Sequence, residues 1–311
     1  MSPRRPWFSE RRKKRPKLRS RPHLLEATSA RQIRQIKLLG RAYTRLQWDY
    51  YSELAYYRAA VADRLTDALS QAADGDTSFS RWQRVVRVKY MLQPLSVAGS
   101  LKDPGGRFNI GDIDAARYPQ FPALYIAQDR VTALQEALGV PSDDENSLAA
   151  ALARPDSIAN FSLSGSIDSV IDLDQPERLQ PFIDVIRTFT ISSHLQKRAQ
   201  ALRANLPNII STVDELLLAL LSRSWRFEAA AVDIPSPSQI FGQLIANAGI
   251  SGVAYPSKFT GKKCLAIFPQ NFRNSDSSIE LDDETPAEVD IRFVDAAVWQ
   301  EKGPLLCGRI R

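Results

Sequence analysis

The charge of this 311-residue chain is concentrated at one end, and this limits which part of it can fold. Residues 1–22 contain ten Lys or Arg against one acid, Glu10, which leaves 31 basic and 34 acidic residues in the rest. Like charges at this density repel one another and bury no apolar surface, so we expect a disordered basic tail over 1–22. Such a tail could follow the phosphates of nucleic acid, or it could only keep the protein in solution. The remainder is mildly acidic and must fold through its apolar residues, which make up 44% of the chain.

Composition narrows the functional classes further. With only two cysteines and two histidines, the chain offers little for a disulfide scaffold, a zinc site or a histidine base. No apolar run approaches the roughly 20 residues that cross a bilayer, and no hydrophobic segment follows the basic start. We therefore expect a cytoplasmic protein with no membrane span, no secretory signal and no metal site.

Residues 23–76 are predicted to form a helical extension. From Ser29 to about Ala72 apolar residues recur every three or four positions, which is the period of a helix. One continuous helix of this length would measure about 65 Å, so we expect a break near Gly40. Its tyrosines could stack on nucleic-acid bases, although such a stripe more often packs in a core or against a partner: Tyr50, Tyr51, Tyr56 and Tyr57.

After Asp74-Gly75-Asp76 the pattern changes to short strands and helices, and we interpret 77–311 as one α+β domain. Its predicted strands cover 85–88, 123–127, 229–234, 264–268 and 289–293, and its predicted helices include 132–138 and 239–247. Residues 142–226 contain helical spacing at 177–206 and 212–222, so we interpret this region as a helical insertion.

A glycine-rich segment, Gly105-Gly106-Arg107-Phe108-Asn109, is the first candidate for chemistry. Two glycines let the backbone approach a ligand closely, and an arginine offers a planar fork of donors that suits a pyrophosphate. Taken alone, such a segment is usually only a turn. The common dinucleotide and Walker phosphate-binding motifs are absent from the sequence.

The order of the segments that follow strengthens the case. The predicted strand Leu124-Tyr125-Ile126-Ala127 precedes Thr132-Ala133-Leu134-Gln135-Glu136, and Tyr255-Pro256-Ser257 precedes a strand that ends in Phe268-Pro269. Taken singly, Tyr125 could be a core residue, Glu136 a solvated helix residue and Ser257 a turn residue. Together and in this order, the segments resemble the RES domain family over about 80–140 and 228–275.

This resemblance implies an ADP-ribosyltransferase-like α+β core and the activity of a bacterial toxin held in check by an antitoxin protein. It implies that NAD is the substrate, not a resident cofactor. The bond between nicotinamide and ribose would be cleaved by hydrolysis or phosphorolysis, so the chain would be an NAD glycohydrolase or phosphorylase.

The resemblance also implies roles for individual residues. Arg107, with Asn109 in the same loop, would hold the NAD phosphates, and Tyr125 would orient the nicotinamide end. Glu136 would stabilise the positive charge that develops on the ribose, as a carboxylate does in glycoside cleavage. Ser257 would position the ribose or nicotinamide through its hydroxyl.

One further arginine of the family's pattern lies on an earlier strand, and spacing does not decide whether it is Arg84 or Arg87. Both are therefore expected NAD-binding residues.

Two departures from the family pattern leave other functions open. The separation of Glu136 from Ser257 is long, which we attribute to the insertion 142–226, and the N-terminal extension lies outside the core domain. One alternative is transfer of ADP-ribose to a macromolecule. The other is a nucleic-acid-associated binding module that uses the basic arm 1–22 and the tyrosine-rich helix.

Overall fold

The computed structural model describes residues 29–139, 158–273 and 275–308, so the basic segment 1–22 lies outside the described residues. The chain divides into two compact units, Met1–Tyr43 and Thr44–Arg311. Helix α1 (Ala30–Ala60) contributes its first residues to the first unit and the rest to the second. The contacts described below belong to the second unit.

The helical region is interrupted at a different residue from the one predicted. Helix α1 continues through Gly40, and the interruption falls at Val61, where the backbone leaves helical geometry (φ −121°, ψ 24°) before α2 (Ala62–Ala72). A lone glycine costs a helix only about 1 kcal/mol relative to alanine, which does not by itself end it.

An eight-stranded sheet forms the centre of the second unit, in the order β10-β9-β5-β1-β4-β8-β7-β6. Neighbouring strands run antiparallel except β6 and β7, which are parallel. The strands are β1 (Thr77–Arg87), β4 (Leu124–Ala127), β5 (Ile158–Ile167), β6 (Val170–Asp172), β7 (Gly252–Pro256), β8 (Lys263–Ile267), β9 (Ser278–Leu281) and β10 (Phe293–Val294). The predicted α+β class is thus confirmed.

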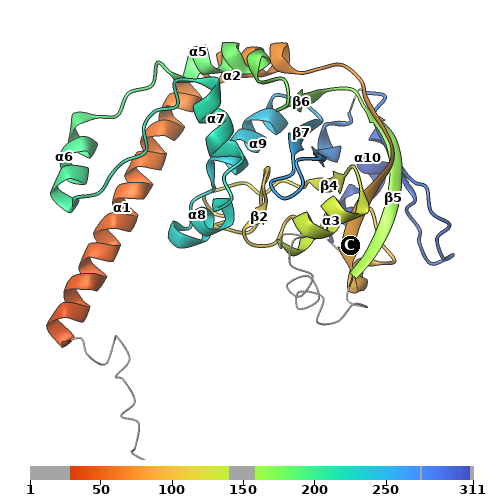
Figure 1. The fold of residues 1–311 in the computed structure, drawn as a ribbon, viewed down its shortest axis with the longest axis horizontal. Helices are drawn as coiled ribbons and strands as arrows, with labels where there is room; N and C mark the ends of the chain where they lie inside the picture. Colours follow the sequence, from red (N-terminus) through yellow and green to blue (C-terminus); the bar gives the residue numbers. More distant parts are fainter. Residues whose placement is uncertain (1–28, 140–157, 274, 309–311) are drawn as a thin grey trace, which may run out of the picture. The chain divides into compact units, whose positions relative to one another are not determined.

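Side chains alternate between the two faces of this sheet and so create two cores. On β8, Cys264 and Ala266 join one buried cluster, while Leu265 and Ile267 join the other. The first cluster is covered by α2, α5 (Gln180–Ile186), α7 (Val213–Leu220) and α9 (Pro237–Asn247), and the second by α10 (Ala296–Leu306) (Figure 1). The alternation follows from the period of two along a strand.

The region predicted as a helical insertion contains two strands of the main sheet. Its first residues, 142–157, lie outside the described residues, but β5 and β6 follow directly, and β5 pairs with both β1 and β9. The segment Asn160–Ile167 does alternate between polar and apolar residues, which is the signature of a strand with one buried face. Within the described part of this region, the helices begin at Pro176.

Three other predicted elements also differ in the structure. The helix predicted over 177–206 is divided into η3 (Pro176–Leu179), α5 and α6 (Ser193–Leu202). The strand predicted over 229–234 is instead helix α8 (Trp225–Val232), in agreement with the high helix propensity of alanine. The strand predicted over 289–293 is reduced to Phe293–Val294.

The C-terminal half of α1 supports α6. Leu46 is fully buried with Leu195 and Ala199 of α6. The carboxylate of Glu53 accepts hydrogen bonds from the backbone N–H (2.6 Å) and the hydroxyl (2.9 Å) of Ser192, which is the N-cap of α6. The extension therefore provides the packing surface for a helix that could not bury its apolar face alone.

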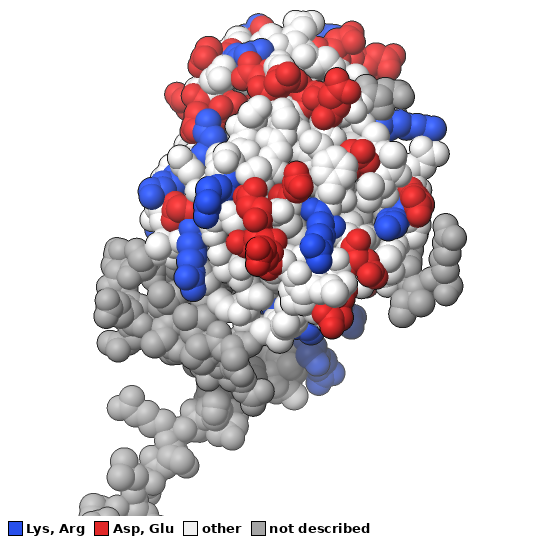
Figure 2. Space-filling model, turned by 90° about the vertical axis from the view of Figure 1, so that its right-hand side faces the viewer, with Lys and Arg blue, Asp and Glu red and all other residues white. Residues whose placement is uncertain are grey.

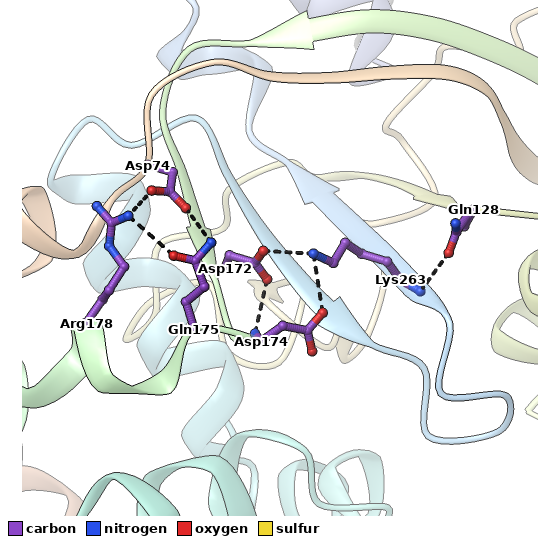
Figure 3. Close-up of polar contacts among 7 residues, drawn as sticks. All are labelled: Asp74, Gln128, Asp172, Asp174, Gln175, Arg178 and Lys263. Carbon is purple, nitrogen blue, oxygen red and sulfur yellow. Dashed lines mark hydrogen bonds and ion pairs between the residues drawn. The ribbon is translucent and has the colours of Figure 1, made fainter.

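A polar network joins β6 and its exit to neighbouring elements (Figure 3). The ammonium group of Lys263 on β8 lies 2.8 Å from a carboxylate oxygen of Asp172 and 3.3 Å from one of Asp174. Asp74, which precedes β1, accepts hydrogen bonds from Gln175 and Arg178. These contacts hold the edge strand β6 beside the rest of the sheet.

The surface of one side of the molecule has no single sign of charge. Figure 2 shows basic and acidic side chains interspersed on this face, with acidic residues more frequent towards its upper end. Such a mixture gives no continuous basic track for a phosphate backbone on the described part of that face.

Because β5 lies inside the sheet, we predict that its buried side chains contribute to the free energy of unfolding. Leu163 is fully buried, and its replacement in Leu163→Ala should lower the free energy of unfolding by about 2–5 kcal/mol. The matched variant Leu218→Ala, at a side chain that is 76% exposed, should change it by less than about 0.5 kcal/mol. Chemical denaturation of both variants measures the difference, and equal stabilities would contradict the placement of β5.

Candidate active site

The glycine-rich segment forms a two-stranded ribbon, β2 (Gly105–Gly106) and β3 (Asn109–Ile110), that lies against Tyr125 of β4. Gly105 has φ +100°, where a side chain would be strained, and a Cβ on Gly106 would overlap the ring of Tyr125. Both glycines are therefore required by the backbone and by close approach to a tyrosine.

Asn109 and Tyr125 hold this ribbon in place. The Tyr125 hydroxyl donates to the side-chain oxygen of Asn109 (2.9 Å) and accepts from the backbone N–H of Phe108 (3.0 Å). The Asn109 amide donates to the carbonyls of Ser100 (2.7 Å) and Phe121 (3.0 Å). Burial raises the pKa of Tyr125. The hydrogen bond from the Phe108 N–H and the nearby positive charge of Arg107 oppose this rise but do not cancel it, so the hydroxyl stays protonated.

Gln239, which the sequence reasoning missed, fixes the ribbon from the other side. It is fully buried on α9, and its amide nitrogen donates to the carbonyls of Pro104 (2.7 Å), Gly106 (3.2 Å) and Asn109 (3.1 Å). Its side-chain oxygen also accepts from the backbone N–H of Ser236 (3.0 Å). The sequence did contain a signal, because Ser236 and Gln239 have the spacing of a capping box at a helix start.

The structure brings Glu136 and Ser257 together, although 121 residues separate them in the chain. Glu136 lies near the end of α3 (Arg130–Leu138), and its carboxylate accepts a 2.6 Å hydrogen bond from the hydroxyl of Ser257, just after β7. The hydroxyls of Thr132 and Thr260 lie 2.9 Å apart and join the same helix to the same turn. A short bond to a carboxylate is a strong one, so the pair is well oriented.

Two buried groups on neighbouring strands lie close to this carboxylate. Burial is the main cause that raises the pKa of the Tyr255 hydroxyl, and the negative charge of Glu136 adds to it. Burial, together with Glu136, also raises the pKa of the Cys264 thiol, so it stays a thiol at neutral pH. The ring of Tyr255 packs 4.9 Å from that of Phe108, which links the Glu136 side of the site to the glycine-rich ribbon.

Arg107 is almost fully buried, at 5% exposure, and is held by the α7–α8 segment. One of its terminal nitrogens donates to the carbonyls of Leu220 (3.2 Å) and Ser222 (2.9 Å), and its guanidinium lies 5.8 Å from the ring centre of Trp225. Its positive charge acts on Tyr125, Tyr255 and Cys264 and opposes the rise in their pKa values. Arg107 thus belongs to the same cluster as Glu136.

The two candidate strand arginines have different surroundings. Arg84 is buried and donates to the carbonyls of Pro94 (2.7 Å), Ser96 (2.6 Å) and Tyr125 (3.0 Å), and burial lowers its pKa to about 10. Arg87, at the end of β1, is exposed. The geometry of Arg84 favours a supporting role, in which it fixes β4 and thereby the position of Tyr125.

In the described part of the chain, no group of three or more His, Cys, Asp or Glu side chains is arranged to hold a metal ion. No described helix is long and apolar enough to cross a membrane.

Chemically, the cluster combines one well-oriented carboxylate, neutral hydroxyls and a buried positive charge in a partly desolvated site. A carboxylate in such surroundings can stabilise a developing cation, and donors beside it can fix the orientation of a polar substrate. Arg107 can attract an anionic group of the same substrate. The arrangement therefore suits cleavage at a carbon centre that becomes positive within an anionic molecule.

The different surroundings of Arg84 and Arg87 lead to a second stability prediction. Arg84→Gln should lower the free energy of unfolding by about 3 kcal/mol or more, because buried carbonyls lose charged donors. Arg87→Gln removes the same charge at an exposed site and should change it by less than about 0.5 kcal/mol. Thermal or chemical unfolding measures both, and a stable Arg84→Gln protein would contradict the supporting role.

Comparison with known proteins adds the following. The sequence matches the model of the RES domain family over residues 81–290. No curated protein matches the chain significantly. Among solved structures, a chain of the M. tuberculosis MbcT–MbcA toxin–antitoxin complex is similar, with 17% sequence identity and a TM-score of 0.38, over 76% of this chain and 96% of that chain.

The family match includes the glycine-rich ribbon, β4, α3 and the β7–β8 hairpin, and it covers more than half of the sequence. The sequence resemblance in the separate segments is thereby confirmed, and this chain belongs to the RES domain family.

Proposed function

We propose that this protein cleaves the bond between nicotinamide and ribose in NAD. The observation that supports this most directly is the hydrogen bond from Ser257 to Glu136, with Tyr125, Tyr255 and Arg107 around it. Family membership adds the expected reaction class. The chain belongs to the RES domain family, and the resemblance to this family implies that NAD is degraded.

Glu136 is the residue we assign to the chemical step. As the bond between the ribose C1′ and the pyridinium nitrogen breaks, its electron pair passes to that nitrogen and positive charge develops on the ribose. A carboxylate beside the ribose stabilises this charge, as in glycoside cleavage. An oxygen of water or phosphate then bonds to C1′ and loses its proton to the solvent.

The remaining residues position the substrate. Ser257 donates to Glu136 and thereby fixes the orientation of the carboxylate next to the ribose. Tyr125 is partly exposed, and burial raises its pKa, so its neutral ring offers aromatic surface to the nicotinamide without adding negative charge. Nicotinamide leaves as a neutral molecule, so the step needs no general acid. A chain with two histidines is suited to such a reaction.

We further propose that the activity is toxic to its host cell and is neutralised by an antitoxin protein. NAD depletion harms any cell that depends on the dinucleotide, and the similar MbcT–MbcA structure is described as a toxin–antitoxin complex. The proposal rests on the family and not on that weak structural likeness.

The nucleic-acid module finds less support in the described residues. Tyr51 packs edge-on against Tyr118 (5.3 Å between ring centres) and Tyr57 stacks on Phe189 (5.4 Å). Rings that are used in packing are not available to stack on bases. Tyr56, at 74% exposure, is the exception.

The purified protein should therefore release nicotinamide from NAD, and Glu136→Gln should lower kcat by roughly 100-fold to 1000-fold because it removes the stabilising charge. Liquid chromatography of the products measures nicotinamide and identifies ADP-ribose or its phosphorylated form. Glu177→Gln is the matched control, since Glu177 is an exposed residue of η3. Undiminished activity in the Glu136 variant would contradict the assignment.

Removal of residues 1–22 provides a separate test of the enzyme against the nucleic-acid module. The truncated protein should retain the kcat and KM of the full chain for NAD, because none of the assigned residues lies in the basic segment. Absence of NAD cleavage in both proteins, together with salt-sensitive nucleic-acid binding that the truncation abolishes, would favour the module instead.

A further inference from the structure

Basic side chains from three separate segments lie near α3, the helix that contains Glu136. Arg107 belongs to the glycine-rich ribbon, Lys258 follows Ser257 directly, and Arg223 and Arg226 lie at the start of α8. Arg107 is buried, Lys258 is half-buried, and the two α8 arginines are exposed.

Two of these arginines, Arg107 and Arg226, lie near the ring of Trp225. Its side chain is 4% exposed, and its ring centre lies 5.8 Å from the guanidinium carbon of Arg107 and 5.1 Å from that of Arg226. A terminal nitrogen of Arg226 also lies beside Gly139, the residue that ends α3. The distance from this nitrogen to the position that a Cβ of residue 139 would occupy is 3.8 Å. Arg226 therefore reaches from α8 to the helix that contains Glu136.

The four cations are close enough to act on one another. Burial and then the charge of Arg107 lower the pKa of Lys258, Glu136 opposes this effect, and Arg226 and Arg223 lower it further. Arg107 and Arg226 share the ring of Trp225, Arg226 reaches the end of α3, and Lys258 is within electrostatic range of the three arginines, so positive charge gathers at this end of the site. Repulsion within such a cluster is relieved when an anion binds between its members.

We propose that Arg223 and Arg226, together with Lys258, bind phosphoryl oxygens, and that the ligand is the pyrophosphate of NAD. This inference rests on the proposed function. The buried Arg107 already donates to two carbonyls of the α7–α8 segment, whereas the exposed α8 arginines present their planar donors at the surface. A guanidinium pairs well with a phosphate because its donors match two oxygens at once. Free phosphate, the acceptor in phosphorolysis, has the same chemistry and is the other possible source.

The experiment compares two substrates in phosphate-free buffer. NAD contains a pyrophosphate, whereas nicotinamide riboside has the same scissile bond and no phosphate. The double variant Arg223→Gln/Arg226→Gln should raise KM for NAD roughly 10-fold to 100-fold, since charged hydrogen bonds are lost, and leave kcat/KM for the riboside unchanged. The double variant Arg64→Gln/Arg187→Gln, at two exposed arginines outside the site, is the charge-matched control and should change neither value.

The remaining outcomes are equally decisive. An equal loss on both substrates, or an unchanged KM for both NAD and added inorganic phosphate, would overturn the inference while leaving the NAD-cleaving function intact. A rise in KM for added inorganic phosphate alone would support phosphoryl binding and identify free phosphate as its source. If the wild-type protein does not cleave NAD, the proposed function fails, and calorimetry with ADP tests the site independently. ADP binding that is weakened in the double variant would support the inference, and absence of ADP binding would overturn it.

Discussion

The hydrogen bond between Ser257 and Glu136 depends on the pairing of three adjacent strands. β4 pairs with β8 and β8 with β7, so the segment after β4, which becomes α3, meets the turn after β7 at one end of the sheet. The same pairing places Tyr125, Cys264 and Tyr255 on one face of the sheet. Residues separated by more than a hundred positions therefore share one site because of strand register.

The second requirement is that the glycine-rich ribbon lie against this face. Tyr125 holds it from the sheet by donating to Asn109 of the ribbon, and Gln239 holds it from α9 by donating to backbone carbonyls. Arg107 then extends to the α7–α8 segment, which covers that side of the site. The long region between β5 and β7 thus contributes to the site as well as to the sheet.

These contacts explain which elements and site residues could be predicted from the sequence and which could not. Short motifs with local signals, such as β4, α3 and the glycine-rich turn, were predicted near their observed bounds, and their order indicated the family. β5 was missed because Gly165 takes an apolar position and weakens the alternation of polar and apolar residues, and α8 was predicted as a strand from a short apolar run. The choice between Arg84 and Arg87, and the part played by Gln239, depend on which carbonyls are buried nearby. The spacing of Ser236 and Gln239 indicates a helix start, but not which carbonyls Gln239 meets once the chain has folded.

The most direct test of the central claim is a crystal structure of the Glu136→Gln variant with NAD. The account predicts that the ribose C1′ of the nicotinamide side lies in contact with the side chain at position 136. It also predicts that the nicotinamide ring lies near Tyr125 or Tyr255. NAD bound elsewhere on the chain, with position 136 remote from C1′, would contradict it.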